Sequence, residues 1–519
     1  MKTLYEGFGT ESSSKIISSL YSKYQWEPVC ISGVYLDKSK NIENEIFNNC
    51  LICYPRHIRR AQFDYSKIGS PAPIDSKALI KLARYESTFM SILGSTQDPT
   101  GWNLSYTERK DYYFDLLTYW NTVILKCKPE LSVFYTWPHT PACYPLYLIC
   151  KHIHNISVLF IDPNPLLNRG LHYIGANLEE LSAPFSTAKD YDNNQHIEHI
   201  EHIEHIEHIE HIEDVLRSNN YDVLDHIKSA FESREKAIFL PKKIINFMRG
   251  KNLLNLHKLP KLFKGDFIDW KSNHKSYLST DSRMNFIQFL IFFEKLKIKN
   301  RMLKKYYASI VENPNLHKDY IYFAAPYQPE ATSYIGGGYY ENVILTIQNL
   351  SAACPQGWVI YYKEHPATFF DTFRGSLKRN KDFYRRLKSF KNVKFIPIEF
   401  DQFNLIDNSK AVAVIYGSTA WESVTRLVPV ISFGQGWYSN CNGIIKVESM
   451  EDLMAALSKI YDGYRPAKED VTAYIASILN NSFEYPEHRY KNQEYGTKRV
   501  NLVSDSYFKA YNKHYGIKK

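Results

Sequence analysis

Short apolar runs alternate with longer helical patterns along this chain, and this alternation constrains the fold more than any other feature. In the second half, strand-like runs end in polar tips within residues 320–333, 357–366 and 411–419. Segments with helical spacing separate them. Strand, helix and strand at this spacing predict βαβ units in a parallel sheet. The first half repeats the pattern, with predicted strands at 28–36, 48–55, 131–137 and 156–165 and a predicted helix at 108–128.

A chain of 519 residues is too long for one ordinary core. We predict an α/β, GT-B-like fold, in which two Rossmann-like parallel-sheet domains face a central cleft. GT-B glycosyltransferases and sugar-nucleotide epimerases share this architecture. The expected divisions are an N-terminal domain at 1–190, an inserted helical and low-complexity segment at 191–315, a C-terminal domain at 316–480, and a helical tail that packs back on the N-terminal domain at 481–519.

The charge and the cysteines narrow the class of protein. A net charge of +9 favours anionic partners such as nucleotides, phospholipids and acidic glycans, whereas the basic and aromatic signatures of RNA binding are absent. Eight cysteines in so long a chain form no disulfide framework. Cys50 and Cys53 lie in an apolar run without a second pair, which favours buried thiols over a zinc site.

Neither a secretion signal nor a membrane span is predicted. The first 15 residues lack an apolar core, and the longest apolar block, Met284–Phe293, is about half the length of a span. We therefore expect a cytoplasmic protein. The basic segment Arg234–Lys264 is interpreted either as an interfacial helix pair on the inner face of the membrane or as a solvated linker.

Six copies of His-Ile-Glu cover His196–Glu213. Because three residues advance a helix by about 300°, the isoleucines circle the whole helix and no single face can be buried. Histidine at every third position allows metal binding. An exposed low-complexity insertion is the favoured interpretation, since a uniform repeat has no convergent ligand geometry.

Three loops in the second half carry most of the polar candidates. The first loop, "APYQPEAT", contains Gln328, a candidate contact of the donor nucleotide, and Glu330, which the prolines keep on a rigid tip. The second, "KEHP", presents Lys363 and His365 where Pro366 ends a strand. The third is "IYGSTAWESV", between a strand and a helix.

The third loop suits a phosphate. Gly417 permits a sharp turn, and Ser418 or Thr419 can cap the following helix, whose free amides attract an anion. Glu422, one turn later, could accept ribose hydroxyls, and His365 could donate to the same phosphate. A hydrolase elbow is disfavoured because it requires Gly-x-Ser-x-Gly. A purely structural N-cap role for Ser418 stays open.

Four stretches, in this order and spacing, resemble the capsule polysaccharide biosynthesis glycosyltransferase family, which includes the retaining β-Kdo transferases. They are "YFAAPYQPEAT", "GWVIYYKEHP", "AVAVIYGSTAWESVTRLVPVISFG" and "WYSNCNG". The resemblance covers Tyr320–Gly443 and, more weakly, Ile80–Pro165; it does not extend to the repeat, the basic segment or the tail. The His-Pro and Ser-Thr motifs are also similar to the CMP site of GT-B sialyltransferases.

The resemblance implies a CMP-sugar donor, most simply CMP-Kdo, and a glycan or glycolipid acceptor. It places His365 and the adjacent Pro366 at the CMP, Ser418 and Thr419 at the phosphate, and Glu422 at the ribose. Glu330 stands where relatives carry an aspartate, as nucleophile or general base. Neither cofactor nor metal is expected, since Lys363, His365 and the helix start can stabilise the phosphate. Nucleic acid is not an expected partner. Peripheral contact with an anionic membrane follows from only one of the two interpretations of Arg234–Lys264.

The acceptor side is less well defined. His139, after a predicted strand, could orient or deprotonate the acceptor hydroxyl, or could simply hydrogen-bond the backbone. Asp162 and Arg169 are weaker candidates. Two other functions stay open: a UDP-sugar-dependent hexosyltransferase or 2-epimerase, and a non-catalytic scaffold that has kept the fold.

Overall fold

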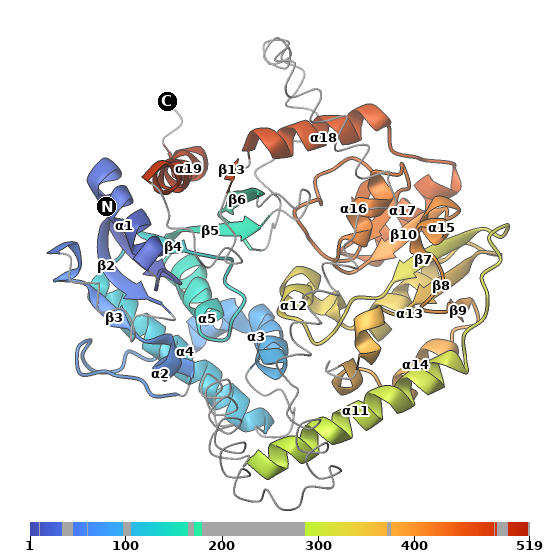
Figure 1. Cartoon of the computed structure of the whole chain (residues 1–519), viewed down its shortest axis with the longest axis horizontal. Coiled ribbons are helices and arrows are strands. Elements are labelled where there is room, and N and C mark those ends of the chain that lie inside the picture. The colour runs from blue at the N-terminus through green and yellow to red at the C-terminus, as the bar shows by residue number, and fades with distance from the viewer. Residues whose placement is uncertain are drawn as a thin grey trace, which may run out of the picture.

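The computed structural model describes residues 1–9, 11–33, 45–59, 61–96, 105–163, 171–178, 286–370, 375–481, 483–484 and 497–516. Two α/β domains lie side by side, each built on one mainly parallel sheet with helices on its faces (Figure 1). The predicted fold class, two Rossmann-like domains, is therefore confirmed. The His-Ile-Glu repeat, Arg234–Lys264 and Arg169 lie outside the described residues.

The N-terminal sheet has the strand order β13-β6-β5-β4-β1-β2-β3. Strands β1 to β5 are parallel; at one edge β6 pairs antiparallel with β5, and β13 pairs antiparallel with β6. The order reverses between β1 and β4, so the loops after these two strands flank the topological switch point. The strands are β1 (Lys2–Glu6), β2 (Glu27–Ser32), β3 (Leu51–Cys53), β4 (Leu131–Phe134), β5 (Ser157–Pro163), β6 (Leu171–Gly175) and β13 (Phe483–Glu484).

Helices cover both faces of this sheet. Helix α4 begins two residues before the predicted start because Ser105 caps it: its Oγ accepts from the Glu108 amide, and Glu108 accepts from the Ser105 amide. Trp120 of α4 is fully buried and donates to the Ala142 carbonyl at 2.8 Å. The helices are α1 (Glu11–Tyr24), α2 (Pro55–Arg59), α3 (Ser76–Thr96), α4 (Tyr106–Cys127), α5 (Cys143–Leu148) and α19 (Thr497–Tyr515), with short turns η1 (Glu45–Phe47) and η2 (Ile149–Ile153).

The C-terminal sheet is fully parallel, in the order β12-β11-β10-β7-β8-β9. The chain builds outward from β7 through β8 to β9, then returns to the other side of β7 with β10. The switch point therefore lies between β7 and β10. The strands are β7 (Tyr320–Ala324), β8 (Val359–Lys363), β9 (Val393–Phe395), β10 (Ala411–Val414), β11 (Val430–Ser432) and β12 (Ile444–Lys446).

Local capping sets the helix boundaries in this domain. Helix α13 begins at Val343, because Asn342 accepts from two helix amides as its N-cap. The helices are α11 (Phe286–Ala308), α12 (Ala331–Gly337), α13 (Val343–Ala353), α14 (Lys381–Lys388), α15 (Gln402–Asp407), α16 (Thr419–Val424), α17 (Met450–Tyr461) and α18 (Lys468–Asn481), with 3-10 turns η7 (Gly338–Glu341), η8 (Pro366–Phe369) and η9 (Gly375–Leu377).

The C-terminal segment returns to the first domain. Helix α18 extends between the domains, and α19 lies beside α1 (Figure 1). Lys23 of α1 forms an ion pair with Asp505 at 2.9 Å, and the rings of Tyr24 and Phe508 stack at 3.9 Å. No helix in the described ranges is both long and apolar enough to span a membrane. All eight cysteines are free thiols; Cys53 is buried and Cys50 half-buried.

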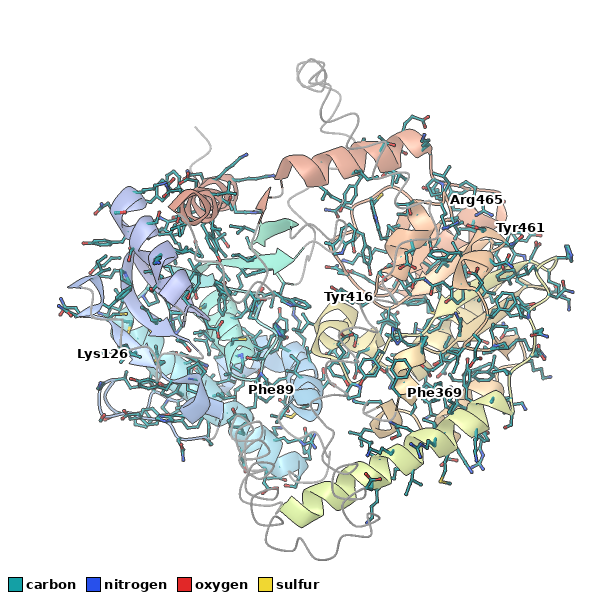
Figure 2. All side chains as sticks on the ribbon, in the orientation of Figure 1. Phe89, Lys126, Phe369, Tyr416, Tyr461 and Arg465 are labelled. Atoms are coloured by element: carbon teal, nitrogen blue, oxygen red, sulfur yellow. The ribbon has the colours of Figure 1, made fainter. Side chains whose placement is uncertain are left out.

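Helix α12 joins the two domains. It packs on α3, and its Tyr334, which is fully buried, belongs to the hydrophobic core of the N-terminal domain. Tyr416, which follows β10, packs against the cores of both domains and lies where they meet (Figure 2). Ser91 of α3 also donates to a Glu341 carboxylate oxygen at 3.1 Å. The contact between the domains is thus part apolar and part polar.

Two glycines allow α12 to approach the sheet closely. A Cβ on Gly336 would collide with the Tyr416 ring, and one on Gly434 would collide with the carbonyls of Ile415 and Gly336. The Gln435 amide donates to the Gly336 carbonyl at 2.8 Å across this contact. The close packing of α12 on the sheet therefore depends on glycine at both positions.

We expect Gly434→Ala to destabilise the protein by about 1–3 kcal/mol, because the added methyl group meets rigid backbone. Gly94→Ala is the matched control: Gly94 lies inside α3, and its Cβ would meet only the flexible Arg109 Nη1 at 3.3 Å. That substitution should be neutral or stabilising. Urea unfolding of both variants checks this, and equal stability would contradict the role given to Gly434.

Candidate functional site

Three polar loops meet at the carboxyl edge of the C-terminal sheet. β7 lies between β10 and β8 and hydrogen-bonds to both. The loops after these strands, 325–330, 364–366 and 415–418, therefore share one edge. Adjacent strands are about 4.8 Å apart, so the ends of β10 and β8 are about 10 Å apart.

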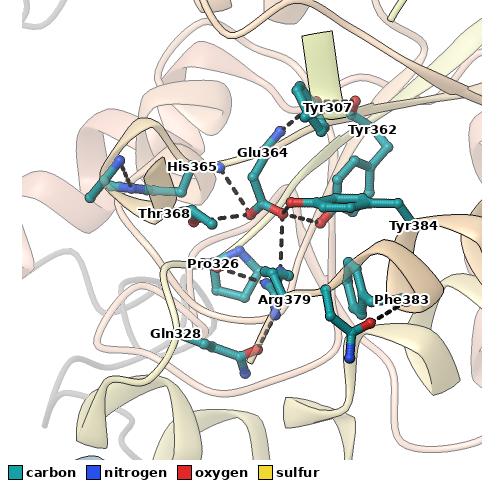
Figure 3. A network of polar contacts seen from close by, with 12 residues as sticks. Tyr307, Pro326, Gln328, Tyr362, Glu364, His365, Thr368, Arg379, Phe383 and Tyr384 are labelled. Carbon is teal, nitrogen blue, oxygen red and sulfur yellow. Dashed lines mark hydrogen bonds and ion pairs between the residues drawn. The ribbon is translucent and has the colours of Figure 1, made fainter. Parts of the chain in front are cut away.

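A buried carboxylate, Glu364, organises the edge. Its side chain is fully buried and forms an ion pair with the Nε of Arg379 at 3.0 Å (Figure 3). Hydroxyl and amide donors satisfy the remaining oxygen positions. These are Tyr362 and Tyr384 at 2.9 and 2.8 Å on Oε2, and Thr368 and the His365 amide at 3.3 and 3.2 Å on Oε1.

Arg379 connects this carboxylate to the loop after β7. Its Nη1 donates to Gln328 Oε1 at 2.9 Å, and its Nη2 donates to the Pro326 carbonyl at 3.2 Å (Figure 3). Burial, the largest single effect, lowers the pKa of the guanidinium, but the charge and hydrogen bond of Glu364 together with the Tyr362 and Tyr384 hydroxyls outweigh it and hold that pKa above its ordinary value. The arginine thus remains charged and fixes the loop.

Gln328 belongs to this network. It is buried, and its Nε2 donates to the Glu341 carbonyl at 2.8 Å while its Oε1 accepts from Arg379. Both ends of the amide are therefore engaged within the chain. The sequence predicts Gln328 as a donor contact; the structure gives it a positioning role for the loop that carries Glu330.

His365 is held in one tautomer. Its half-buried ring caps η8, with Nδ1 accepting from the Ala367 amide at 3.1 Å, so the neutral ring carries its proton on Nε2. Burial lowers its pKa to about 4, with Lys363 and Arg379 acting in the same direction and Glu364 opposing. At neutral pH the side chain is therefore a hydrogen-bond donor through Nε2. Pro366 occupies the first position of η8.

Lys363 is the buried cation of the edge. It ends β8 and is 7% exposed. Burial lowers its pKa to about 8, although the nearby carboxylates of Asp401, Glu399 and Glu422 favour the charged form. Such an amine is charged at neutral pH, and its charged form is stabilised when an anion binds beside it.

The third loop differs from its predicted form. Ser418 stands at the N-cap position of α16 but adopts helical angles and does not cap; its Oγ donates to Glu422 Oε1 at 2.9 Å. The other Glu422 oxygen accepts from Gln402 at 2.9 Å. The carboxylate is 9% exposed, and burial raises its pKa against the effect of the Ser418 hydrogen bond. The capping prediction for Ser418 is thus wrong, because Glu422 takes its hydroxyl.

Gly417 and Thr419 complete this loop. Gly417 has φ +149°, which favours glycine, and its amide donates to the Tyr438 hydroxyl at 3.1 Å. The space where its Cβ would lie is open. Thr419 is half-buried at the start of α16, a helix of six residues. A ligand at this edge therefore finds open space beside Gly417.

Glu330 is exposed, unlike the buried carboxylates of Glu364 and Glu422. It is exposed at the N-cap position of α12, with an extended backbone and no capping hydrogen bond from its side chain. Its carbonyl accepts from Ser333 Oγ at 3.0 Å. The strand before its loop, β7, lies between β8 and β10, the strands that precede His365 and Ser418.

His139 follows β4 at the switch point of the N-terminal sheet. Its Nδ1 donates to the Trp137 carbonyl at 2.7 Å, which agrees with the backbone hydrogen bond considered from the sequence. The lone pair of the ring is then on Nε2, the opposite arrangement to His365. Asp162 lies in β5; its side chain is outside the part of the chain that the structure describes.

A cavity of about 590 Å³ opens between the domains. Its walls come from α3 and α5 on one side and from α12, η7 and the ends of β11 and β12 on the other. Six of the twenty lining residues are aromatic: Tyr85, Tyr144, Tyr147, Tyr339, Tyr340 and Phe433. It shares Gly336 with the α12 contact at Tyr416. Within the described ranges, no group of three or more His, Cys, Asp or Glu side chains could hold a metal ion.

No protein-family model and no curated protein sequence matches the chain. Solved structures resemble it at low scores. The β-Kdo 2,7 transferase KpsC of Thermosulfurimonas dismutans is 10% identical with a TM-score of 0.26, over 73% of this chain and 90% of that one. The UDP-GlcNAc 2-epimerase of Methanocaldococcus jannaschii is 15% identical with a TM-score of 0.24, over 92% and 99%. Likenesses at this level carry no argument about the reaction.

We expect Glu364→Gln to cost about 3–5 kcal/mol, because it leaves the Arg379 charge buried without its partner. Asp382→Asn is the control: it removes the carboxylate of an ion pair with Arg385 whose side chains are 76% and 64% exposed, and should leave stability unchanged. Urea unfolding distinguishes them. Wild-type stability of Glu364→Gln would refute the organising role of this pair.

Proposed function

We propose that this protein is a glycosyltransferase that uses a nucleotide sugar. One observation carries the proposal: a cation, a neutral histidine donor and an exposed carboxylate stand at the end of β8 and in the loops after β8 and β7, at the carboxyl edge of the C-terminal sheet, beside the switch point between β7 and β10. These are Lys363, His365 and Glu330. Ligands of open α/β sheets bind at this position. The first two groups can bind a nucleotide phosphate, and the third can act as the nucleophile or base of glycosyl transfer.

The donor phosphate is assigned to the space beside Gly417. There the charged Lys363, the His365 Nε2–H and the Thr419 hydroxyl can converge on it, whereas the Ser418 hydroxyl donates its one proton to Glu422. Glu422 holds Ser418 in place through its 2.9 Å hydrogen bond, and a ribose at Glu422 would have to displace Ser418 or Gln402. We therefore assign Glu422 to positioning of the loop.

The reaction breaks the bond between the anomeric carbon and the phosphate oxygen, and the nucleotide leaves with the electron pair. Glu330 forms a transient bond to that carbon, and the acceptor hydroxyl then displaces it. The hydroxyl proton passes to Nε2 of His139, whose lone pair follows from the Trp137 hydrogen bond. Two displacements retain the anomeric configuration. The cavity between the domains can hold the acceptor glycan.

The resemblance of the loop motifs favours a CMP donor that carries an acidic 2-keto sugar, Kdo, for β-linked transfer to a surface glycan or glycolipid. A UDP-sugar-dependent hexosyltransferase or 2-epimerase would use the same fold and a similar phosphate site. A scaffold without turnover would keep the fold and lose the reaction. The nucleotide base and the presence of turnover discriminate among these functions.

We expect CMP to raise the melting temperature of the protein and UDP to leave it unchanged. Glu330→Gln should keep the CMP effect but lower transfer from CMP-Kdo by at least about 100-fold, because binding and bond formation use different groups. Glu451→Gln, an exposed glutamate of α17, is the matched control. Differential scanning fluorimetry and a product assay measure both effects.

Protection by UDP without protection by CMP would contradict the CMP assignment and favour the UDP enzymes. Protection by CMP with no transfer in the wild-type protein, for any Kdo-terminated or phospholipid acceptor tested, would support the scaffold. Full transfer by Glu330→Gln would remove Glu330 from the reaction while leaving the donor site in place.

CMP affinity should fall about tenfold between pH 7 and pH 9, because the Lys363 amine, with a pKa of about 8, loses its charge as the pH rises. CMP itself keeps its charge in this range, since the second phosphate pKa is about 6. Lys363→Arg should bind with little pH dependence and Lys363→Met weakly at every pH. Isothermal titration calorimetry measures this.

Lys394→Met is the control, because Lys394 forms an ion pair with Glu312 near the surface, with side chains 44% and 52% exposed. It should keep both the affinity and the pH dependence of the wild type. A wild-type affinity that stays constant from pH 7 to pH 9 would show that Lys363 does not contact the phosphate.

A further inference from the structure

Helix α11 carries one buried stripe. Leu296, Asn300, Leu303 and Tyr307 are all at most 4% exposed and recur at intervals of three or four residues. They face η8, η9 and α14. Asn300 anchors the helix, since its Nδ2 donates to the Phe370 carbonyl at 2.7 Å. This side of the helix is therefore fixed to the C-terminal domain.

The opposite side of α11 combines large apolar and basic residues. At about 100° per residue, Ile298, Arg301, Met302 and Lys305 fall within one outward arc, with Lys295 at its border. Ile298 and Met302 are 56% and 54% exposed, and Lys295, Arg301 and Lys305 are exposed as well. We call these five residues the outward stripe of α11. The helix runs along the lower edge of the molecule in Figure 1.

The helix is strongly basic. Within residues 294–305 six lysines and arginines stand against a single acidic residue, Glu294, which pairs with Lys297 at 2.7 Å. Glu294 lies on the same side as the outward stripe, one turn before Ile298, whereas Lys297 lies outside it. The stripe has three cations, so even with Glu294 this side of the helix keeps a net positive charge that complements an anionic surface.

We propose that the outward stripe docks α11 onto an anionic phospholipid surface. Cations attract the helix to the lipid headgroups, and Ile298 and Met302 enter the boundary between headgroups and acyl chains. The apolar stems of Lys295 and Lys305 can lie along that boundary while their ammonium groups reach phosphate. A nucleic acid would use the cations but would leave Ile298 and Met302 in water. The mixed stripe thus fits lipid better than nucleic acid.

Docking through α11 would orient the candidate site. Tyr307, on the buried stripe, accepts from the Glu364 amide at 3.1 Å and donates to the Ile396 carbonyl at 2.9 Å. Through Tyr307 the docked helix is therefore hydrogen-bonded to the residues that follow β8 and β9. This inference does not depend on the sugar-transfer reaction, since it concerns where the domain is held.

The test is sedimentation of the full chain with vesicles. Wild-type protein should bind vesicles of phosphatidylcholine mixed with phosphatidylglycerol, release as salt rises, and ignore pure phosphatidylcholine. Lys295→Glu/Arg301→Glu/Lys305→Glu should lower the affinity by about tenfold or more. Ile298→Ser/Met302→Ser should weaken binding about fivefold while keeping its salt dependence.

The matched control is Lys459→Glu/Lys509→Glu/Lys513→Glu, which changes the net charge equally with exposed lysines of α17 and α19. It should bind within about twofold of the wild type. Melting temperatures confirm that each variant is folded. Failure of the wild type to bind anionic vesicles would overturn the proposal. An equal loss in both triple variants, or a full affinity in both α11 variants, would overturn it as well.

Discussion

The ion pair between Glu364 and Arg379 is the interaction on which the carboxyl edge of the C-terminal sheet depends. Both side chains are at most 2% exposed, and removing two charges from water is costly unless every polar position is matched. Here two tyrosine hydroxyls, a threonine hydroxyl and a backbone amide complete the carboxylate, while Gln328 and the Pro326 carbonyl complete the guanidinium. The pair consequently holds the loops after β7 and β8 in one arrangement.

That arrangement sets the electrostatics of the candidate site. Burial lowers the pKa of Lys363 to about 8 and of His365 to about 4, so one is a cation and the other a neutral donor near neutral pH. The Ala367 amide fixes which nitrogen of His365 donates. A phosphate bound there would meet a charge and an oriented dipole without reorganisation, which is the physical basis of stabilising a departing nucleotide.

The sequence predicts the strands and the polar loops of this domain because their signals are local: apolar runs, prolines and a glycine at a strand tip. It does not reveal that Glu364, within "KEHP", is a buried structural carboxylate, or that Arg379 is its partner. Fifteen residues separate the two, and no spacing rule links them. The capping role predicted for Ser418 fails for a similar reason, because Glu422 competes for its hydroxyl. The catalytic roles of Glu330 and His139 stay predictions.

The same network also reaches the N-terminal domain. Ser91 of α3 donates to Glu341, whose carbonyl accepts from Gln328, and Gln328 in turn accepts from Arg379. The loop that carries Glu330 is thus fixed both to the strand tip that presents His365 and to the neighbouring domain. Since α12 follows Glu330 and packs on α3, a change in the spacing of the domains would move this carboxylate relative to the donor loops. The position of Glu330 relative to the loops after β8 and β10 is therefore coupled to the contact between the two domains.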